Sequence, residues 1–199
     1  MKENYNMAQN QRLVIGISGA SGAALGIRLL QACQKLELET HLVISKAGEI
    51  TIAQETNKSV SEVKALASHT HKSADIGAAI ASGSFQTMGM VVVPCSIRTM
   101  SEIATGVTSS LLTRAADVTL KERRKLLLAV RETPFHTGHL RTLTQLSEMG
   151  AIIAPPVPAF YTKPETTAEI VDQFTGHLLR LMGIDNDLAR EWTGLKGGA

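Results

Sequence analysis

The stretch Arg12-Leu-Val-Ile-Gly-Ile-Ser-Gly-Ala-Ser-Gly22 joins a short apolar run to a loop of small residues. An unbroken apolar run of this length is typical of a strand that is buried on both faces of a parallel sheet. From Gly22 to Leu36, apolar residues recur at spacings of three and four, which predicts a helix. A buried strand, a glycine-rich loop and a helix in this order predict the first unit of an α/β domain.

Further apolar runs predict four more strands, separated by helical patterns. The predicted strands cover residues 40–45, 90–94, 125–131 and 151–154. The predicted helices cover residues 108–124, 137–149 and 166–182, and Ser59 with Glu62 has the capping-box spacing that opens a short helix. Strands that alternate with helices form a mainly parallel sheet covered on both faces, so we predict a doubly wound α/β domain.

The composition limits the domain organisation and the classes of partner. A chain of 199 residues with 44% hydrophobic and 19% charged residues fits one domain. We expect residues 12–192 to form it, with 1–11 as a flexible leader and 193–199 as a C-terminal tail. The net charge of +2 argues against nucleic acid or an anionic membrane as a partner, and no apolar run approaches a membrane span. Cys33 and Cys95 make no disulfide framework, which favours a reducing cytoplasm.

In a doubly wound sheet the ligand binds beyond the carboxyl ends of the strands, so the residues after each strand are candidates for the site. After the first strand, Gly19, Ala20 and Ser21 allow close approach to the backbone, and the next helix directs its amide-rich end at an anion. A tight turn that binds nothing is the alternative. After the second strand, Ser45 and Lys46 stand where a dinucleotide-binding domain usually has an acid, which favours a mononucleotide.

Polar groups also follow the third and fourth predicted strands. Ser96, Arg98 and Thr99 lie where a helix begins, either as a clamp for an anion or carbonyl or as a helix cap beside a surface arginine. Arg131 and Glu132 end the fourth strand, either to bind an anion and transfer a proton or as an exposed ion pair. The residues by themselves leave both pairs of interpretations open.

Two more segments carry possible function. After the fifth strand, three prolines stiffen a segment that presents Phe160 and Tyr161, which indicates a lid or an oligomer contact. Arg114, Asp117 and Lys121 share one helix face, as a solvated ion-pair stripe or as the site of a second phosphate.

The histidines do not indicate a metal site. His69 and His71 are two positions apart, His136 and His139 are three apart, and neither pair has a clear third ligand, so we predict no metal. Glu55 lies in a helical stretch and on its own is typical of a solvated face.

Eight segments, taken in order along the chain, resemble the UbiX-like flavin prenyltransferase family. They are Gly-Ile-Ser-Gly-Ala-Ser-Gly at 16–22, Ile-Ser-Lys at 44–46, Glu-Thr at 55–56, Ser-Gly-Ser at 82–84, Pro-Cys-Ser-Ile-Arg-Thr at 94–99, Arg-Ala-Ala-Asp-Val-Thr-Leu-Lys-Glu-Arg-Arg at 114–124, Arg-Glu-Thr-Pro at 131–134 and Pro-Ala-Phe-Tyr at 158–161. The resemblance runs from about Arg12 to Trp192. It implies a Rossmann-like or flavodoxin-like three-layer domain that binds flavin.

The resemblance also implies an activity, the transfer of a dimethylallyl group from dimethylallyl phosphate to reduced FMN. Bonds at flavin N5 and C6 create prenylated FMN, the cofactor of UbiD-like decarboxylases in ubiquinone biosynthesis or in reactions of aromatic acids. Older labels for such proteins are aromatic acid decarboxylase and 3-polyprenyl-4-hydroxybenzoate decarboxylase. The family further implies a homododecamer that needs no metal.

The matching positions imply roles for individual residues. Those at the flavin are Gly19, Ala20, Ser21, Ser45, Ser96, Thr99 and Arg131. Those that hold the prenyl phosphate are Lys121, Tyr161 and Arg180, with Arg114 alongside. The implied catalytic residues are Ser21, Glu55, Lys121 and Glu132, of which Glu132 handles a proton at the flavin. The implied pocket wall is Trp192 and Ile76, and some relatives have a tryptophan where this chain has Ile76.

Two other functions stay open at this stage. An FMN-dependent oxidative decarboxylase of cysteine-containing substrates has a related fold, although Arg98 is an awkward substitute within the matching segment of those enzymes. A non-catalytic flavin carrier is the second alternative, and it does not need Lys121, Glu132 and Arg180 together.

Overall fold

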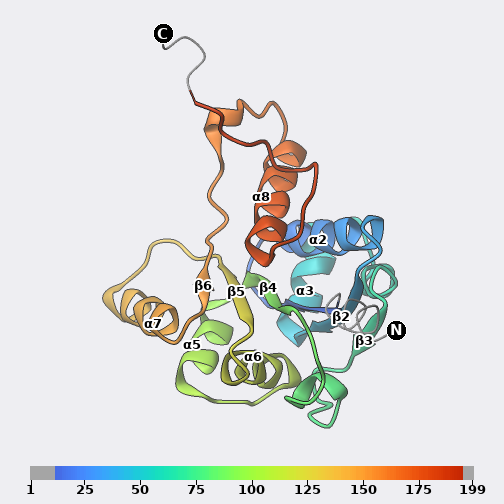
Figure 1. The fold of residues 1–199 in the computed structure, drawn as a ribbon, viewed down its shortest axis with the longest axis vertical. Coiled ribbons are helices and arrows are strands. Elements are labelled where there is room, and N and C mark those ends of the chain that lie inside the picture. The colour runs from blue at the N-terminus through green and yellow to red at the C-terminus, as the bar shows by residue number, and fades with distance from the viewer. Residues whose placement is uncertain (1–11, 195–199) are drawn as a thin grey trace, which may run out of the picture.

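The computed structural model describes residues 12–194, which form a parallel sheet between two layers of helices (Figure 1). In these residues there are six strands: β1 (Arg12–Ile17), β2 (Glu39–Ile44), β3 (His69–His71), β4 (Gly89–Cys95), β5 (Lys125–Val130) and β6 (Ile152–Ile153). All are parallel, in the spatial order β3-β2-β1-β4-β5-β6. The order reverses between β1 and β4, so the sheet is doubly wound with its switch point at these two strands.

The helices cover both faces of the sheet. On one face lie α2 (Ala23–Lys35), α3 (Lys46–Glu55), α4 (Val60–Lys64) and α8 (Thr167–Met182); on the other lie α5 (Ile97–Thr105), α6 (Leu111–Lys121) and α7 (Thr137–Glu148) (Figure 1). Short 3₁₀ turns occur at η1 (Ala79–Ala81) and η2 (Phe160–Thr162). The predicted three-layer doubly wound architecture is therefore confirmed. None of the helices in residues 12–194 has both the length and the apolar character needed to cross a membrane.

The central strand β1 is buried on both faces, as its apolar run predicts. Leu13, Ile15 and Ile17 belong to the core that α2 and α8 cover, while Val14 belongs to the core that α5 and α6 cover. Alternate side chains of a strand point to opposite faces, so this one strand joins the two cores. Each fully buried leucine or isoleucine side chain stabilises the fold by about 1.5–3 kcal/mol.

Some elements differ from the expectation. The sequence does not predict β3, because its three residues His-Thr-His are polar and too few to show a period. The predicted strand at 151–154 is only Ile152–Ile153, and the predicted helix at 108–124 is the shorter α6, whose start Ser110 caps. The expected leader, residues 1–11, and residues 195–199 of the expected tail lie outside the described residues.

Candidate active site

A cleft of about 270 Å³ lies at the carboxyl edge of the sheet, beside the switch point between β1 and β4. The loops after β1, β2 and β4 line it, together with the start of α6. Four of the residues expected at the flavin are among the lining residues: Gly19, Ser45, Ser96 and Thr99. The carboxyl-edge rule, applied to the sequence, thus leads to a cavity that exists in the structure.

A buried serine ties together the two strands at the switch point. Ser18 is fully buried, and its backbone N–H and its Oγ both donate to the carbonyl of Pro94, at 3.1 and 3.0 Å. The N–H of Ser96 donates to the same Oγ at 2.8 Å. Pro94 lies where the register of β4 on β5 shifts between Val92 and Cys95, which lets a central strand contain a residue without an N–H. These bonds hold the loops after β1 and β4 together beside the cleft.

The loop after β1 passes close to the start of α3, and this approach requires glycine. A Cβ atom on Gly19 would lie 2.2 Å from the Cβ of Ala47, far inside van der Waals contact. Gly22 precedes α2 with a φ of 104°, in the left-handed region that favours glycine. The close approach to Ala47 therefore requires glycine at 19, and the left-handed backbone favours glycine at 22. The open cleft beside Gly19 leaves room for a ligand next to its backbone.

Three helices begin at the cleft, and a serine caps each of them. The backbone N–H three residues on donates to Ser45 Oγ at 3.0 Å at the start of α3, to Ser96 Oγ at 3.3 Å at the start of α5, and to Ser110 Oγ at 3.3 Å at the start of α6. The helix-cap interpretation of Ser96 is thus confirmed. Helix N-termini carry partial positive charge, so three of them converging on one cleft favour an anionic or electron-rich ligand.

Three charged residues line the cleft: Lys46, Arg98 and Glu102. Arg98 lines the cleft, but its side chain is 84% exposed and its Nε donates to Glu102 at 2.8 Å. The surface-arginine interpretation of Arg98 is therefore correct. Ser45 and Lys46 line the cleft at the end of β2, where a dinucleotide-binding sheet usually carries the acid that binds a ribose. This donor set suits a mononucleotide.

Glu55 binds the amino end of α2 from outside that helix. Its Oε2 accepts from the backbone N–H of Gly22 at 2.8 Å and of Ala23 at 3.0 Å. Burial tends to raise the pKa of Glu55, but these two donors, the Ser21 hydroxyl and the positive charge of Arg131 lower it below its ordinary value. Glu55 lies at the surface, as the residues alone suggest, yet it holds the loop that carries Ser21.

Arg131 and Glu132 follow β5 at the same edge of the sheet. The Cδ of Arg131 is 3.9 Å from the position that a Cβ on Gly22 would occupy, so this side chain lies beside the loop after β1. Glu132 is exposed, and its Oε1 accepts from the N–H of Thr133 at 2.9 Å. Among the ion pairs of residues 12–194, none joins Arg131 to Glu132, so the ion-pair alternative is wrong for this pair.

The residues expected at the prenyl phosphate are dispersed in the part of one chain that the structure describes. Lys121 ends α6 at the amino edge of the sheet, opposite the cleft, where it pairs with Glu122. Arg180 is in the last turn of α8, also toward the amino edge, and donates to the carbonyl of Ala189. Arg114 pairs with Asp117 at 2.8 Å. The 11 residues of α6 span about 16 Å, so Lys121 lies well away from the cleft.

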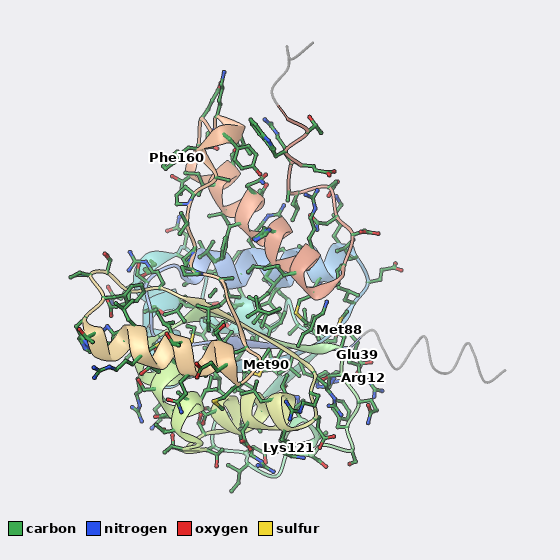
Figure 2. All side chains as sticks on the ribbon, turned by 60° about the vertical axis from the view of Figure 1, so that its left-hand side comes forward. Arg12, Glu39, Met88, Met90, Lys121 and Phe160 are labelled. Atoms are coloured by element: carbon green, nitrogen blue, oxygen red, sulfur yellow. The ribbon has the colours of Figure 1, made fainter. Side chains whose placement is uncertain are left out.

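Phe160, Tyr161 and Trp192 are not among the residues that line the cleft. Tyr161 contacts Trp192 edge to face, with ring centroids 5.4 Å apart, and both side chains are about half exposed. Phe160 and Lys121 mark opposite ends of the molecule in Figure 2. Ile76, in contrast, is exposed only two residues beyond Ala74, which lines the cleft.

Sequence reasoning missed some of the lining residues. Ser110 and Thr113 start α6 with a reciprocal capping pair, a pattern that could have placed this helix start at the cleft. Ser73 comes to the cleft from the segment after β3, and no sequence pattern indicates it. Cys33 and Cys95 are buried, and burial raises the pKa of each thiol to about 12, so neither is a nucleophile.

A doubly wound sheet with converging helix N-termini at its switch point is typical of nucleotide-binding α/β proteins, and the absence of an acid after β2 favours a mononucleotide. The sequence model of the family described as Flavoprotein matches residues 1–179. The chain is 54% identical over 187 residues to the flavin prenyltransferase UbiX of Escherichia coli K12, an alignment that covers 92% of this chain and 99% of that relative. The chain belongs to the flavin prenyltransferase family, as its sequence motifs indicate.

Two solved structures share the fold over nearly the whole chain. AnUbiX (PadA1), whose crystal structure is a complex with FMN and dimethylallyl pyrophosphate, matches with a TM-score of 0.92 and 45% identity, over 94% of this chain and 100% of that one. The dodecameric FMN-dependent UbiX-like decarboxylase from Escherichia coli O157:H7 matches with a TM-score of 0.90 and 47% identity, over 92% of this chain and 100% of that one.

Proposed function

We propose that this chain transfers the dimethylallyl group of dimethylallyl phosphate to N5 and C6 of reduced FMN, with residues 12–192 as the single flavin-binding domain. The product, prenylated FMN, passes to a UbiD-like decarboxylase, in ubiquinone biosynthesis or in reactions of aromatic acids. The observation that carries the proposal is a cleft with three capped helix N-termini in a chain that is 54% identical to a flavin prenyltransferase.

The donors around the cleft fit FMN. The residues that bind it are Gly19, Ala20, Ser21, Ser45, Ser96, Thr99 and Arg131, through hydroxyls, backbone amides and one guanidinium. When bound, reduced FMN supplies the nucleophile N5, so the chain needs no nucleophile of its own. The thiols of Cys33 and Cys95 are buried and unreactive, as expected if the flavin and not the protein supplies the nucleophile.

Glu132 accepts the proton that leaves flavin C6, and Ser21 orients the reacting groups. A carboxylate with one oxygen held by a backbone donor keeps the other free for proton transfer, and Glu132 has this arrangement through Thr133. Glu55, which the resemblance groups with the catalytic residues, is better understood as a positioning residue. Its carboxylate is taken up by the amides of Gly22 and Ala23, and it acts through the loop that these residues end.

The prenyl phosphate is held where chains meet in an oligomer. Lys121, Tyr161 and Arg180, with Arg114 alongside, cannot surround one phosphate within the described part of a single chain, because Lys121 lies at the opposite end of α6 from the cleft. The exposed aromatic groups of Phe160, Tyr161 and Trp192 are suited to burial between subunits. A homododecamer like that of the solved relative brings the residues of neighbouring chains together, with Trp192 and Ile76 as wall. Lys121 and its neighbours neutralise the charge that develops on the leaving phosphate.

The proposed location is the cytoplasm. Cys33 and Cys95 are both buried and unpaired within residues 12–194, as expected for a protein that stays in a reducing compartment.

The test is anaerobic incubation of the purified protein with reduced FMN and dimethylallyl phosphate, followed by mass spectrometry of the bound flavin. A mass gain of one prenyl unit is expected. Flavin that is bound but unchanged in mass selects the carrier alternative. In a separate incubation with oxidised FMN, which accepts the two electrons, release of carbon dioxide from a peptide with a C-terminal cysteine selects the oxidative decarboxylase.

A further inference from the structure

A cluster of polar side chains lies across β2 and β3, on the part of the sheet away from the cleft. Glu39 and His41 are alternate residues of β2, and His69 and His71 are alternate residues of β3. The two strands are parallel, with His41 opposite His69 in register. Because alternate residues of a strand point to the same face, the four side chains share one face of the sheet. His41 is four residues from Ser45, which places the cluster about 13 Å along the strand from the cleft.

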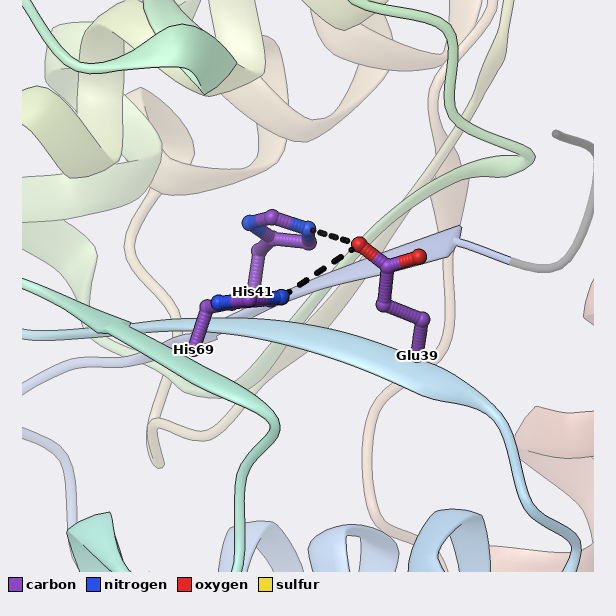
Figure 3. A group of neighbouring side chains, drawn as sticks. All are labelled: Glu39, His41 and His69. Atoms are coloured by element: carbon purple, nitrogen blue, oxygen red, sulfur yellow. Dashed lines mark hydrogen bonds and ion pairs between the residues drawn. The ribbon is translucent and has the colours of Figure 1, made fainter.

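One carboxylate oxygen of Glu39 faces two imidazoles (Figure 3). The distance from Glu39 Oε1 is 3.0 Å to His41 Nε2 and 3.5 Å to His69 Nε2. The three atoms lie within 4.8 Å of one another. The rings of His41 and His69 are stacked, with centroids 4.7 Å apart, and the Nε2 atom of each ring lies on the side of Glu39 Oε1.

We propose that Glu39, His41 and His69 bind a divalent transition-metal ion, Zn²⁺ or one of similar ligand preference. Tetrahedral zinc with bonds of about 2.0–2.1 Å holds its ligand atoms about 3.3 Å apart. Two of the three observed separations, 3.0 and 3.5 Å, lie on either side of this value, and all three are within 4.8 Å. Two imidazoles and a carboxylate are a common zinc ligand set, and water takes the fourth position. In the sequence the pair His69 and His71 lacks a third ligand; the structure instead brings His69 together with two groups of β2, Glu39 and His41.

Neighbouring side chains orient these ligands. His71 Nε2 lies 3.0 Å from His41 Nδ1, and Arg12 Nε donates to Glu39 Oε2 at 3.0 Å, which leaves Oε1 directed at the imidazoles. Outer contacts of this kind fix the rotation of a metal ligand and raise affinity. The positive charge of Arg12 opposes a cation, so the affinity is lower than it would be beside a neutral residue.

Binding changes tautomers and requires no redox partner. Without metal, the Nε2–H of His41 donates to Glu39, so its Nδ1 accepts from the Nε2–H of His71. With metal, Nε2 of His41 gives its lone pair to the ion and the ring proton sits on Nδ1, which donates to Nε2 of His71. His71 then carries its own proton on Nδ1, and His69 binds through a neutral Nε2.

The ion has a route to the site and a structural effect there. His41 is buried, with 5% of its surface exposed, whereas the side chain of His69 is 54% exposed, so the ion enters from the side of β3. β3 is a three-residue edge strand, and the chain beyond it leads to Ser73, whose carbonyl accepts from the N–H of Leu111 at 2.8 Å. An ion that joins β2 to β3 therefore stabilises the segment that reaches the cleft.

The experiment uses full-length protein without a histidine tag, stripped of metal by a chelator and dialysed. Zn²⁺ is titrated in competition with a chromogenic chelator, and Co²⁺ is added separately because its visible absorption reports tetrahedral coordination. We expect one equivalent of Zn²⁺ per chain. His69→Val removes one ligand at an exposed position and keeps a β-branched residue on the strand; the affinity for Zn²⁺ falls at least about tenfold. Glu39→Gln is a second, independent variant that also lowers the affinity for Zn²⁺.

The matched control is the double variant His136→Asn with His139→Gln. It removes another stacked histidine pair, with ring centroids 3.6 Å apart at the start of α7, and leaves the affinity for Zn²⁺ unchanged. Thermal unfolding gives a separate readout, because bound Zn²⁺ raises the Tm of the wild type and does not raise that of His69→Val. Equal affinity of the wild type and both cluster variants, or loss of binding in the α7 control, overturns the proposal.

Discussion

Replacing Glu55 with alanine removes the carboxylate that caps the amino end of α2. Two backbone donors lose their acceptor, Gly22 at 2.8 Å and Ala23 at 3.0 Å. Loss of a capping side chain costs about 0.5–2 kcal/mol, and a charged acceptor lies in the upper part of that range, so we expect about 1–2 kcal/mol at neutral pH. In a chain of this size each 1 kcal/mol shifts Tm by about 2–4 °C, so Tm falls by about 2–8 °C.

The same contacts make the effect depend on pH. Although burial tends to raise the pKa of Glu55, the donors at Gly22 and Ala23, the Ser21 hydroxyl and the charge of Arg131 lower it below the ordinary value of 4.5. A carboxyl with a lower pKa in the folded chain gives its full stabilisation above the ordinary pKa and loses it as the pH falls through the folded pKa. The stability difference between the wild type and Glu55→Ala is therefore constant near neutrality and narrows below pH 4.5.

Urea unfolding followed by circular dichroism at neutral pH and at about pH 4 measures this difference. Glu49→Ala is the matched control, because Glu49 lies on the same helix α3 and makes only a surface pair with Lys64 at 2.7 Å; its loss costs less than about 1 kcal/mol. Flavin affinity, followed by fluorescence quenching, falls in Glu55→Ala because the capped loop carries Ser21. Equal stability of Glu55→Ala and the wild type at neutral pH, or a difference that stays constant in acid, would refute the reasoning.

Three further changes test the site. Gly19→Ala places a Cβ 2.2 Å from that of Ala47, so we expect a loss of about 1–3 kcal/mol in urea unfolding and weaker FMN binding; unchanged binding would contradict the close approach. Glu132→Gln should slow formation of prenylated FMN at least about a hundredfold while FMN affinity stays the same, and a normal rate removes Glu132 from proton transfer. Lys121→Ala and Arg180→Ala should each abolish turnover. If Lys121 and Arg180 of one site come from different chains, a randomly mixed assembly of the two variants should contain both residues at about a quarter of its sites and recover that share of the activity. No recovery on mixing contradicts the shared site.

Much of the fold follows from local sequence patterns. The apolar runs at β1, β4 and β5 and the apolar second half of β2 each predict a strand, because a strand buried on both faces is rich in apolar side chains. The sequence does not predict β3, because this strand is polar and forms only by pairing with the free edge of β2.

For the candidate site, too, the sequence predicts some residues and misses others. Gly19, Ser45 and Ser96 can be found from the sequence, because a residue that directly follows a parallel strand must lie at the carboxyl edge. Glu55 cannot be found in this way, because its partners at Gly22 and Ala23 are more than thirty residues away along the chain.

The sequence by itself determined the alternation of strands and helices, the residues that follow each strand at the carboxyl edge, and the family. These depend on residues a few positions apart, whose spacing sets the local backbone conformation. The tertiary structure alone decided that Glu39 and His41 meet His69, that Glu55 caps α2, and that Lys121 and Arg180 lie away from the cleft of their own chain. Such contacts depend on strand order and on the direction of each helix, which the packing of the whole sheet determines and no short stretch of sequence contains.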